Sequence, residues 1–467
     1  MNYLIQNASV VNEGEIFAAD VFVADGVVRE IRRHGVSRSD TQPFAPAAAK
    51  PGTDSPLAAT HNTTVIDASG KYLIPGIIDE HVHFREPGLT SKADIFHESR
   101  AAVAGGVTSF MDMPNTVPQT TTRQLLEDKF ELASRSSIAN YSFYLGATND
   151  NIRELLGIDT AKVCGIKLFM GSSTGNMLVD NGEALETLFR EAPCLIAAHC
   201  EDESIIRRNT ALYRAKVESG EITPDASIHP LVRNSEACFR STEYAVALAA
   251  KTGARLHVMH ISTEAELSLF HSDIALSDKK ITAETCPHYL ILDQSRYADL
   301  GFRIKCNPAV KSAEDRAALV GALRSGLIDT IGTDHAPHLL EEKCSGDYFT
   351  SKSGFPSIQH SFELMNTVPG LTLAEIVRLM CHNPAILYGI DRRGFIREGY
   401  HADLAIIDAA CPGCISGDGE FSKCGWTPYE GFQTNVKVTH TFVNGNLVFE
   451  NGEIREGTLG DRLIFNR

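Results

Sequence analysis

Short apolar runs alternate with amphipathic stretches along the chain from residue 72 onward. Such alternation predicts repeated strand–helix units around a parallel sheet. Helical patterns occupy 91–106, 183–192 and 312–326. Eight strands with helices between them predict an α/β fold, a (β/α)8 TIM-type barrel over residues 72–390. The eight candidate strands read "LIPGIIDEHVHF", "VTSFMDM", "YSFYLGA", "GIKLFM", "LIAAHC", "RLHVMH", "KITAET" and "IDTIGTD".

The segments on either side of this region read as strands without intervening helices. After residue 391 the chain contains "GFIREGYHADLAIID" and "HTFVNGNLVFENG", and the second of these holds an Asn-Gly hairpin signal. We expect residues 1–71 and 391–467 to form one small β-sandwich domain together. Residues 38–62 are rich in Ala, Pro, Ser and Thr and have no apolar period, which predicts a flexible loop.

Composition limits the classes of function. The chain has 467 residues, 43% hydrophobic and 22% charged, which is typical of a soluble globular protein. A net charge of -16 disfavours nucleic-acid binding, so an anionic substrate would need local cations. The start, "MNYLIQNASVVNEGEIF", lacks the pattern of a signal peptide, and no apolar run approaches bilayer-spanning length. We therefore expect a cytoplasmic protein without nucleic-acid or membrane partners.

Candidate chemistry gathers where the predicted strands end. Barrel enzymes carry their active sites at the carboxyl ends of the strands. His81 and His83 end the first strand and share a face, because strand side chains alternate. His199 and His260 end the fifth and sixth strands, and Asp334 ends the eighth. A single histidine of this kind is more often a hydrogen-bonded core residue, but the set consists of metal-ligand types and predicts a metal centre.

Lys167 lies on the fourth predicted strand and needs its own explanation. An ammonium does not bind a metal ion, and a buried unpaired ammonium is costly. One interpretation is a lysine whose head group reaches a carboxylate. The other is a lysine whose depressed pKa yields a neutral amine that captures carbon dioxide, so that the resulting carbamate bridges two cations.

Six motifs together resemble the successive signatures of the amidohydrolase superfamily. They read "DEHVHFREPG", "MDMPNT", "GIKLFM", "AAHCE", "HVMHIST" and "GTDHAPH". Within the superfamily, the chain most resembles the microbial class I dihydroorotase family, from about residue 64 to the end and including "GWTPYEG". The resemblance implies two divalent metal ions, with Zn2+ as the default. It implies ligands as follows: His81, His83 and Asp334 for the first ion, His199 and His260 for the second, and carboxylated Lys167 as the bridge.

The resemblance also implies a reaction. Family members interconvert L-dihydroorotate plus water and N-carbamoyl-L-aspartate, a step of de novo pyrimidine biosynthesis. Asp334 would be the catalytic residue that orients the attacking hydroxide and passes its proton to the leaving nitrogen. The implied partner is this small-molecule substrate, and a homodimer is suggested.

The substrate carboxylate would need a cationic partner, and Arg85 is placed to supply one. It lies two residues beyond His83 on the same face, and a guanidinium can bind a carboxylate through two parallel hydrogen bonds. By resemblance, Asn115 and His338 join it on that carboxylate, and Asn307 lies beside the ring. Taken alone, Asn115 is equally well a turn residue and His338 a loop histidine.

Two other functions compete with this interpretation. An allantoinase or a dihydropyrimidinase-like cyclic amidase would share the fold and the metals, and "ETCPHYL" at 284–290 is more similar to allantoinases. Arg85 and Asn115 weigh against that alternative. A noncatalytic barrel paralogue would have lost metal ligands, whereas all six ligand types are present here at strand ends.

Overall fold

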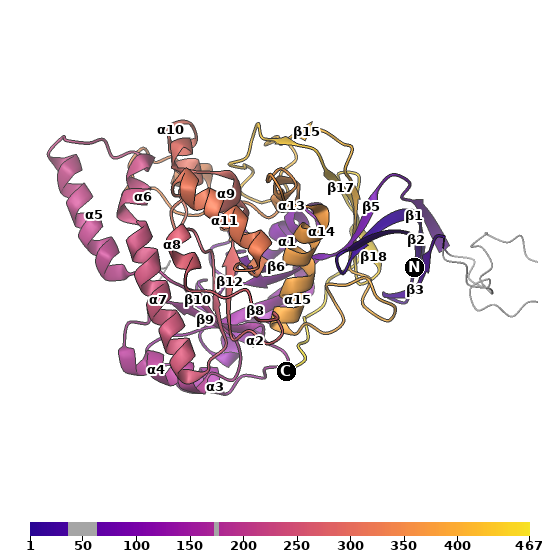
Figure 1. Ribbon diagram of the computed structural model, residues 1–467, viewed down its shortest axis with the longest axis horizontal. Helices are drawn as coiled ribbons and strands as arrows, with labels where there is room; N and C mark the ends of the chain where they lie inside the picture. The colour runs from indigo at the N-terminus through magenta and orange to yellow at the C-terminus, as the bar shows by residue number, and fades with distance from the viewer. Residues whose placement is uncertain (36–62, 172–176) are drawn as a thin grey trace, which may run out of the picture.

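The computed structural model describes residues 1–35, 63–171 and 177–467. The loop predicted at 38–62 lies outside the described residues. Figure 1 shows two parts side by side: a barrel surrounded by helices, and a sheet that contains the strands from both ends of the chain. The (β/α)8 prediction and the pairing of the two termini in one small β domain are confirmed.

The barrel contains all eight predicted strands, and neighbours in the chain are neighbours in the sheet. Every pair is parallel, as helix crossovers require. A parallel bridge between Val82 and His335 brings the last strand back to the first. The strands are β6 (Ile77–Val82), β7 (Val107–Asp112), β8 (Asn140–Gly146), β9 (Gly165–Phe169), β10 (Ile196–His199), β11 (Leu256–Val258), β12 (Ile281–Thr285) and β13 (Thr330–Ile331).

The first predicted strand, at 73–84, is in fact two strands. β5 (Tyr72–Pro75) pairs with the terminal sheet, and β6 starts the barrel. Gly76 separates them, and a Cβ there would lie 2.1 Å from Oγ1 of Thr108. Glycine is needed at this close approach, and the continuous apolar pattern "LIPGII" conceals the change of sheet.

Of the α-helices in the described ranges, eleven lie between barrel strands and four follow the last of these strands. In the helix predicted at 312–326, Ser312 and Asp315 form a capping box, and Gly326 ends it with φ 78°. The helices are α1 (Ile95–Ala104), α2 (Arg123–Ser136), α3 (Ile152–Leu156), α4 (Gly182–Glu191), α5 (Glu203–Glu218), α6 (His229–Val232), α7 (Ser235–Thr252), α8 (Glu264–Leu267), α9 (Pro287–Ile291), α10 (Tyr297–Leu300), α11 (Ala313–Ser325), α12 (Leu340–Lys343), α13 (Ser361–Met365), α14 (Leu373–Val377) and α15 (Asn383–Tyr388).

The terminal sheet is mixed and hydrogen-bonded as one sheet of nine strands. Asn444 and Gly445 have φ 50° and 73° and form the tight turn that the Asn-Gly signal predicted. A separate ribbon pairs β15 (Gly413–Cys414) with β16 (Gln433–Thr434). The nine strands are β1 (Asn2–Asn12), β2 (Glu15–Ala24), β3 (Val27–Arg33), β4 (Thr63–Asp67), β5, β14 (Leu404–Asp408), β17 (Lys437–Val443), β18 (Asn446–Glu450) and β19 (Glu453–Ile454).

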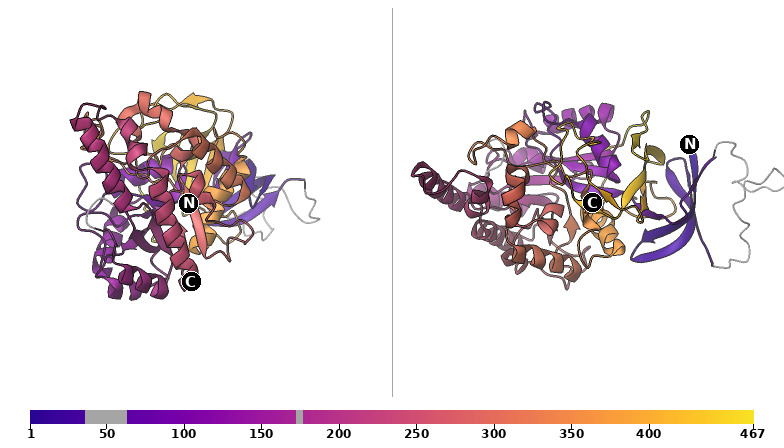
Figure 2. Two further views of the ribbon diagram at one scale, coloured as in Figure 1. Left: turned by 60° about the vertical axis from the view of Figure 1, so that its left-hand side comes forward. Right: turned by 90° about the horizontal axis from the view of Figure 1, so that it is seen from above.

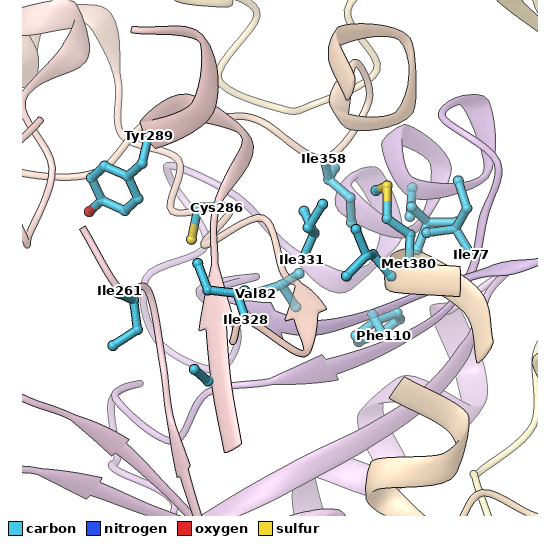
Figure 3. Close-up of a cluster of buried hydrophobic side chains, with 14 of the residues drawn as sticks. Ile77, Val82, Phe110, Ile261, Cys286, Tyr289, Ile328, Ile331, Ile358 and Met380 are labelled. Atoms are coloured by element: carbon cyan, nitrogen blue, oxygen red, sulfur yellow. The ribbon is translucent and has the colours of Figure 1, made fainter. Parts of the chain in front are cut away.

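A buried apolar cluster joins the strands to the surrounding helices. Ile77, Phe110, Ile331 and Met380 meet in this cluster, and all four are at most 1% exposed (Figure 3). The terminal sheet projects from the barrel on the side away from α5, as two further views show (Figure 2). Within the described ranges, no helix combines the length and the apolar character needed to cross a membrane.

Candidate metal centre and substrate pocket

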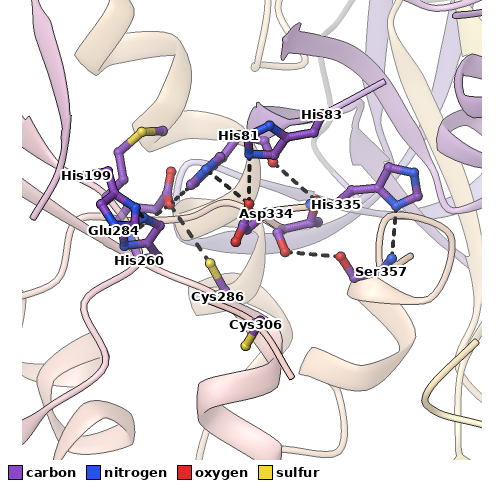
Figure 4. A network of polar contacts seen from close by, with 12 residues as sticks. His81, His83, His199, His260, Glu284, Cys286, Cys306, Asp334, His335 and Ser357 are labelled. Carbon is purple, nitrogen blue, oxygen red and sulfur yellow. Dashed lines mark hydrogen bonds and ion pairs between the residues drawn. The ribbon is translucent and has the colours of Figure 1, made fainter. Parts of the chain in front are cut away.

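A cavity of about 60 Å³ lies among residues that end or follow the barrel strands. Nine of the ten predicted site residues line it, and the tenth, His338, lies beside Arg85. Figure 4 shows the histidines and Asp334 converging from separate strands. The nine are His81, His83, Arg85, Asn115, Lys167, His199, His260, Asn307 and Asp334.

The first group of donors is built by β6 and the segment after β13. Nε2 of His81 lies 3.3 Å from Oδ1 of Asp334, and Nε2 of His83 lies 3.1 Å from the same oxygen. The far side of each ring donates to an oxygen: Nδ1 of His81 to Glu284 at 2.7 Å, and Nδ1 of His83 to Asn115 at 2.8 Å. In neutral rings the inner nitrogens therefore carry lone pairs that point at an anionic oxygen.

The second group of donors comes from the ends of β10 and β11. Nε2 of His199 donates to Glu201 at 3.0 Å, so Nδ1 of this ring carries the lone pair when the ring is neutral. That nitrogen lies 2.8 Å from Nε2 of His260. The His260 and His81 ring centroids are 5.3 Å apart, so both groups belong to one centre.

The surroundings hold these groups in their metal-binding protonation states. Burial raises the pKa of the Asp334 carboxyl, but His81 and His83 outweigh this effect and hold it well below its usual range. Burial lowers the pKa of His83 to about 4 and brings that of His260 well below its usual value. Burial also lowers the pKa of His199, against the opposing effect of Glu201. At neutral pH His83, His199 and His260 are therefore neutral imidazoles beside a carboxylate.

Lys167 points into the same cavity from β9 and is 1% exposed. Its Nζ lies 2.8 Å from Sδ of Met259 and forms no ion pair within the described part of the chain. Burial lowers the pKa of Lys167 to about 8, against the attraction of Glu284 and Asp334. A lysine carboxylate pair, one of the two interpretations of this residue, is therefore absent from the described ranges, and the amine is partly neutral near physiological pH.

Backbone strain concentrates at the same place. Arg85, His260 and Asp334 have φ 67°, 45° and 47°. These are three of only nine non-glycine residues with positive φ in the described ranges, and such conformations are uncommon outside glycine. Strain of this kind persists where the surrounding structure fixes it, commonly at functional sites.

The cavity also contains a buried guanidinium cation. Arg85 is 4% exposed, donates through Nε to the Pro337 carbonyl at 3.1 Å, and has no carboxylate ion pair within the described ranges. Its Nη2 lies 3.2 Å from Nε2 of His338. Trp426 of "GWTPYEG" donates to the His338 carbonyl at 2.8 Å and fixes the loop.

Asn115 and Asn307 occupy different positions in the cavity. The amide oxygen of Asn115 accepts from His83, so this side chain also orients a metal-ligand type. The Oδ1 atom of Asn307 is buried without a hydrogen-bond partner among the described residues. An orphaned acceptor in a polar cavity is placed to receive a donor from a ligand.

Comparison with known proteins agrees with this geometry. Residues 72–448 match the model of the amidohydrolase family. The chain belongs to the amidohydrolase family. A dihydroorotase of Methanothermobacter thermautotrophicus is 32% identical over 84% of this chain and 87% of its own length. An allantoinase of Deinococcus radiodurans is 32% identical over 87% and 91%. The solved structure of an L-hydantoinase (dihydropyrimidinase) from Arthrobacter aurescens has a TM-score of 0.86, with 27% identity over 97% of each chain.

The donor set of this amidohydrolase is consistent with a metal site, and His81, His83 and Asp334 form one group that could hold an ion. Lone pairs of His81 and His83 face the Asp334 carboxylate, and two imidazole nitrogens face each other at 2.8 Å. The contacts of His81 and His83 with Asp334 are unfavourable without a cation or an additional proton, whereas a neutral His260 can donate through Nε2 to Nδ1 of His199. Mixed imidazole and carboxylate donors suit zinc, cobalt and manganese. The assignment of individual residues to individual ions stays a prediction.

The structure adds three side chains that the sequence reasoning did not select. Glu284 and Glu201 hold the outer nitrogens of His81 and His199, respectively, and Lys92 lies 3.0 Å from Nδ1 of His338. A Cβ at Gly332 would lie 2.6 Å from Oε2 of Glu284, so glycine is needed beside this carboxylate. Glu284 and Glu201 could have been selected from the sequence, because each lies at or just beyond the end of a predicted strand. No sequence signal distinguishes Lys92.

Proposed function

We propose that this amidohydrolase is a metal-dependent dihydroorotase, which interconverts L-dihydroorotate plus water and N-carbamoyl-L-aspartate. The observation that carries the proposal is Arg85. Its guanidinium is buried beside the candidate metal centre without an ion pair in the described ranges. A buried unpaired charge is costly, and a substrate carboxylate would form an ion pair with this guanidinium. Dihydroorotate supplies that carboxylate next to the cyclic amide.

The proposed roles of the remaining residues follow from their contacts. A metal pair would supply Lewis acidity and a water molecule of lowered pKa when bound. Asp334 would take the proton of the attacking water at its carboxylate and deliver it to the ring nitrogen as the amide C–N bond breaks. Arg85 and His338 would hold the carboxylate so that the ring carbonyl is presented in one orientation.

Lys167 would be the bridging ligand in its carboxylated form. Its neutral amine would attack carbon dioxide, forming a C–N bond and releasing one proton. The product is an anion, which would suit a position between two cations. The lowered pKa and the absence of an ion pair within the described ranges support this role over that of a lysine held by a carboxylate.

The test is a panel of dihydroorotate, allantoin and dihydrouracil on metal-loaded protein. We expect dihydroorotate to have the highest kcat/KM. Arg85→Ala should lower kcat/KM for dihydroorotate, because the carboxylate loses a charged double hydrogen bond. The expected loss corresponds to ~2–4 kcal/mol of transition-state binding free energy. Arg85→Lys keeps the charge without the planar fork and should recover part of the loss. Metal content should be unchanged in both variants.

A second candidate is an allantoinase, supported by the relative that is as similar as the dihydroorotase. The motif "ETCPHYL" loses weight as a substrate signal, because Glu284 contacts His81 rather than the Arg85 side of the cavity. Faster turnover of allantoin than of dihydroorotate would replace the proposal with this candidate. Unchanged dihydroorotate turnover in Arg85→Ala would remove the observation that carries the proposal and leave only the broader function of a cyclic amidase.

A further inference from the structure

A second and larger cavity adjoins the candidate active site. Its volume is about 510 Å³, within the range of about 300–1,000 Å³ that is typical of small-molecule sites. Side chains of α5 line it, and this helix lies on the side of the barrel away from the terminal sheet (Figure 1). Asn307 and Ser353 line both cavities, so the two adjoin at these residues.

The walls of this larger cavity carry an excess of positive charge. Arg207 and Arg214 of α5 are exposed, whereas Arg233 and Lys305 are buried. Glu203 is the one carboxylate among the residues that line it. Four cations and one anion line this cavity, although the whole chain carries a net charge of -16.

Pairing neutralises two of the four cations. Arg207 lies 2.9 Å from Glu203, and Arg233 forms a buried ion pair with Glu201. The Lys305 ammonium instead donates to the carbonyls of Tyr348 at 2.7 Å and Ser351 at 2.5 Å.

Arg214 is the exposed member of the remaining pair of cations. Its guanidinium stacks over the Phe349 ring, 4.1 Å from the centroid. Neither Arg214 nor Lys305 forms an ion pair within the described part of the chain. The cavity therefore retains two uncompensated positive charges, one exposed and one buried, next to a small inner cavity of about 60 Å³.

We propose that this cavity is an outer binding site for the ring-opened substrate, a small dicarboxylate, which it holds before transfer past Asn307 to Arg85. The inference rests on the proposed function, because it takes the inner ligand to be a carboxylate. Two uncompensated cations match two carboxylates. A charged cavity of this kind raises the local concentration of an oppositely charged ligand and its rate of association, and salt weakens the effect.

The kinetic test compares Arg214→Gln with Arg208→Gln. Arg208 is on the same helix but does not line the cavity. Its guanidinium lies 3.5 Å from the Glu236 carboxylate. At low ionic strength, Arg214→Gln should lower kcat/KM about 9-fold for N-carbamoyl-aspartate and about 3-fold for dihydroorotate, because the lost attraction scales with the ligand charge. At ~0.5 M salt the difference from Arg208→Gln should fall below about twofold. A loss that persists at high salt, or equal values for the two variants, overturns the proposal.

A binding measurement tests the cavity without turnover. Succinate is the probe, and Arg85→Ala is the background, so that the inner carboxylate site is disabled. We expect weak succinate binding in Arg85→Ala that drops at least about 5-fold when Arg214→Gln is added and stays unchanged when Arg208→Gln is added. Equal binding in the two double variants overturns the outer site. If the wild type turns over neither proposed substrate, the proposed function fails, and this measurement still decides whether the cavity binds a dicarboxylate.

Discussion

The two sides of the cavity, the proposed metal side and the proposed substrate side, are built in different ways. His81 and His199 stand on barrel strands, and carboxylates from β12 and from just beyond β10 hold their outer nitrogens. Arg85 and His338 follow the strands in connecting segments, and their partners also come from connecting segments: Lys92 lies before α1, and Trp426 lies between β15 and β16. The barrel thus fixes the groups that would activate water, while the loops carry the groups that would select the substrate.

Asp334→Asn should have the largest effect, because it removes the proposed proton carrier on the metal side. An amide cannot accept the proton, and we expect kcat to fall about 10³–10⁴-fold. Asparagine tolerates the positive φ of this position, so the variant should fold. Turnover of dihydroorotate and the thermal unfolding midpoint are the measurements. Activity within about tenfold of wild type would assign the proton transfer to another group.

Lys167→Ala tests the centre of the metal side. Loss of the bridging anion should reduce bound metal below two ions per chain and lower activity about 10²–10³-fold, and short carboxylates such as acetate should restore part of both. Lys279→Ala is the control, because that buried lysine is ion-paired with Asp329 away from the cavity. Two bound metals and full activity in Lys167→Ala would exclude the carbamate.

The pattern of apolar and polar positions along the chain was sufficient to predict most of this arrangement. Eight strands were recognised from apolar runs, and the ends of parallel strands meet at one face, so His81, His199 and His260 could be brought together from sequence. The pattern does not show the split of the first strand at Gly76, because both halves are apolar and the close approach of Thr108 that requires glycine there leaves no local signal.

The same pattern does not predict which side chains form hydrogen bonds with the site residues and orient them. Glu284 contacts His81 across 203 positions of the chain, and Lys92 contacts His338 across 246. Such contacts depend on the registration of distant strands and loops, which no local period records. The sequence therefore predicts the residue types of the centre better than the partners that orient them.

Glu284→Gln should have a moderate effect, a loss of metal affinity, and should act on the metal side alone. The Glu284 carboxylate accepts from His81 at 2.7 Å and from the His260 backbone N–H at 3.1 Å. A neutral amide is a weaker acceptor, so metal affinity should fall about 10–100-fold, measured by chelator competition. The KM for dihydroorotate in excess metal should change little. If Glu284→Gln binds metal tightly but has a raised KM, then Glu284 acts on substrate binding, and the two sides of the cavity are not separate in function.

Lys92→Met should have the smallest effect and should act on the substrate side alone. Lys92 donates to Nδ1 of His338 at 3.0 Å, so in the neutral ring Nε2 carries the proton, and it lies 3.2 Å from Nη2 of Arg85, where both would donate to one carboxylate. Without Lys92 the ring can reverse its tautomer and accept from Arg85 instead. We expect the KM for dihydroorotate to rise about 5-fold, ~1 kcal/mol, with kcat and metal content little changed. Lys92→Gln retains a donor and should recover part of the affinity, while Lys251→Met, a surface lysine paired with Glu186, should match wild type. A Lys92→Met variant that lowers kcat or loses metal would show that the substrate side supports the metal centre as well.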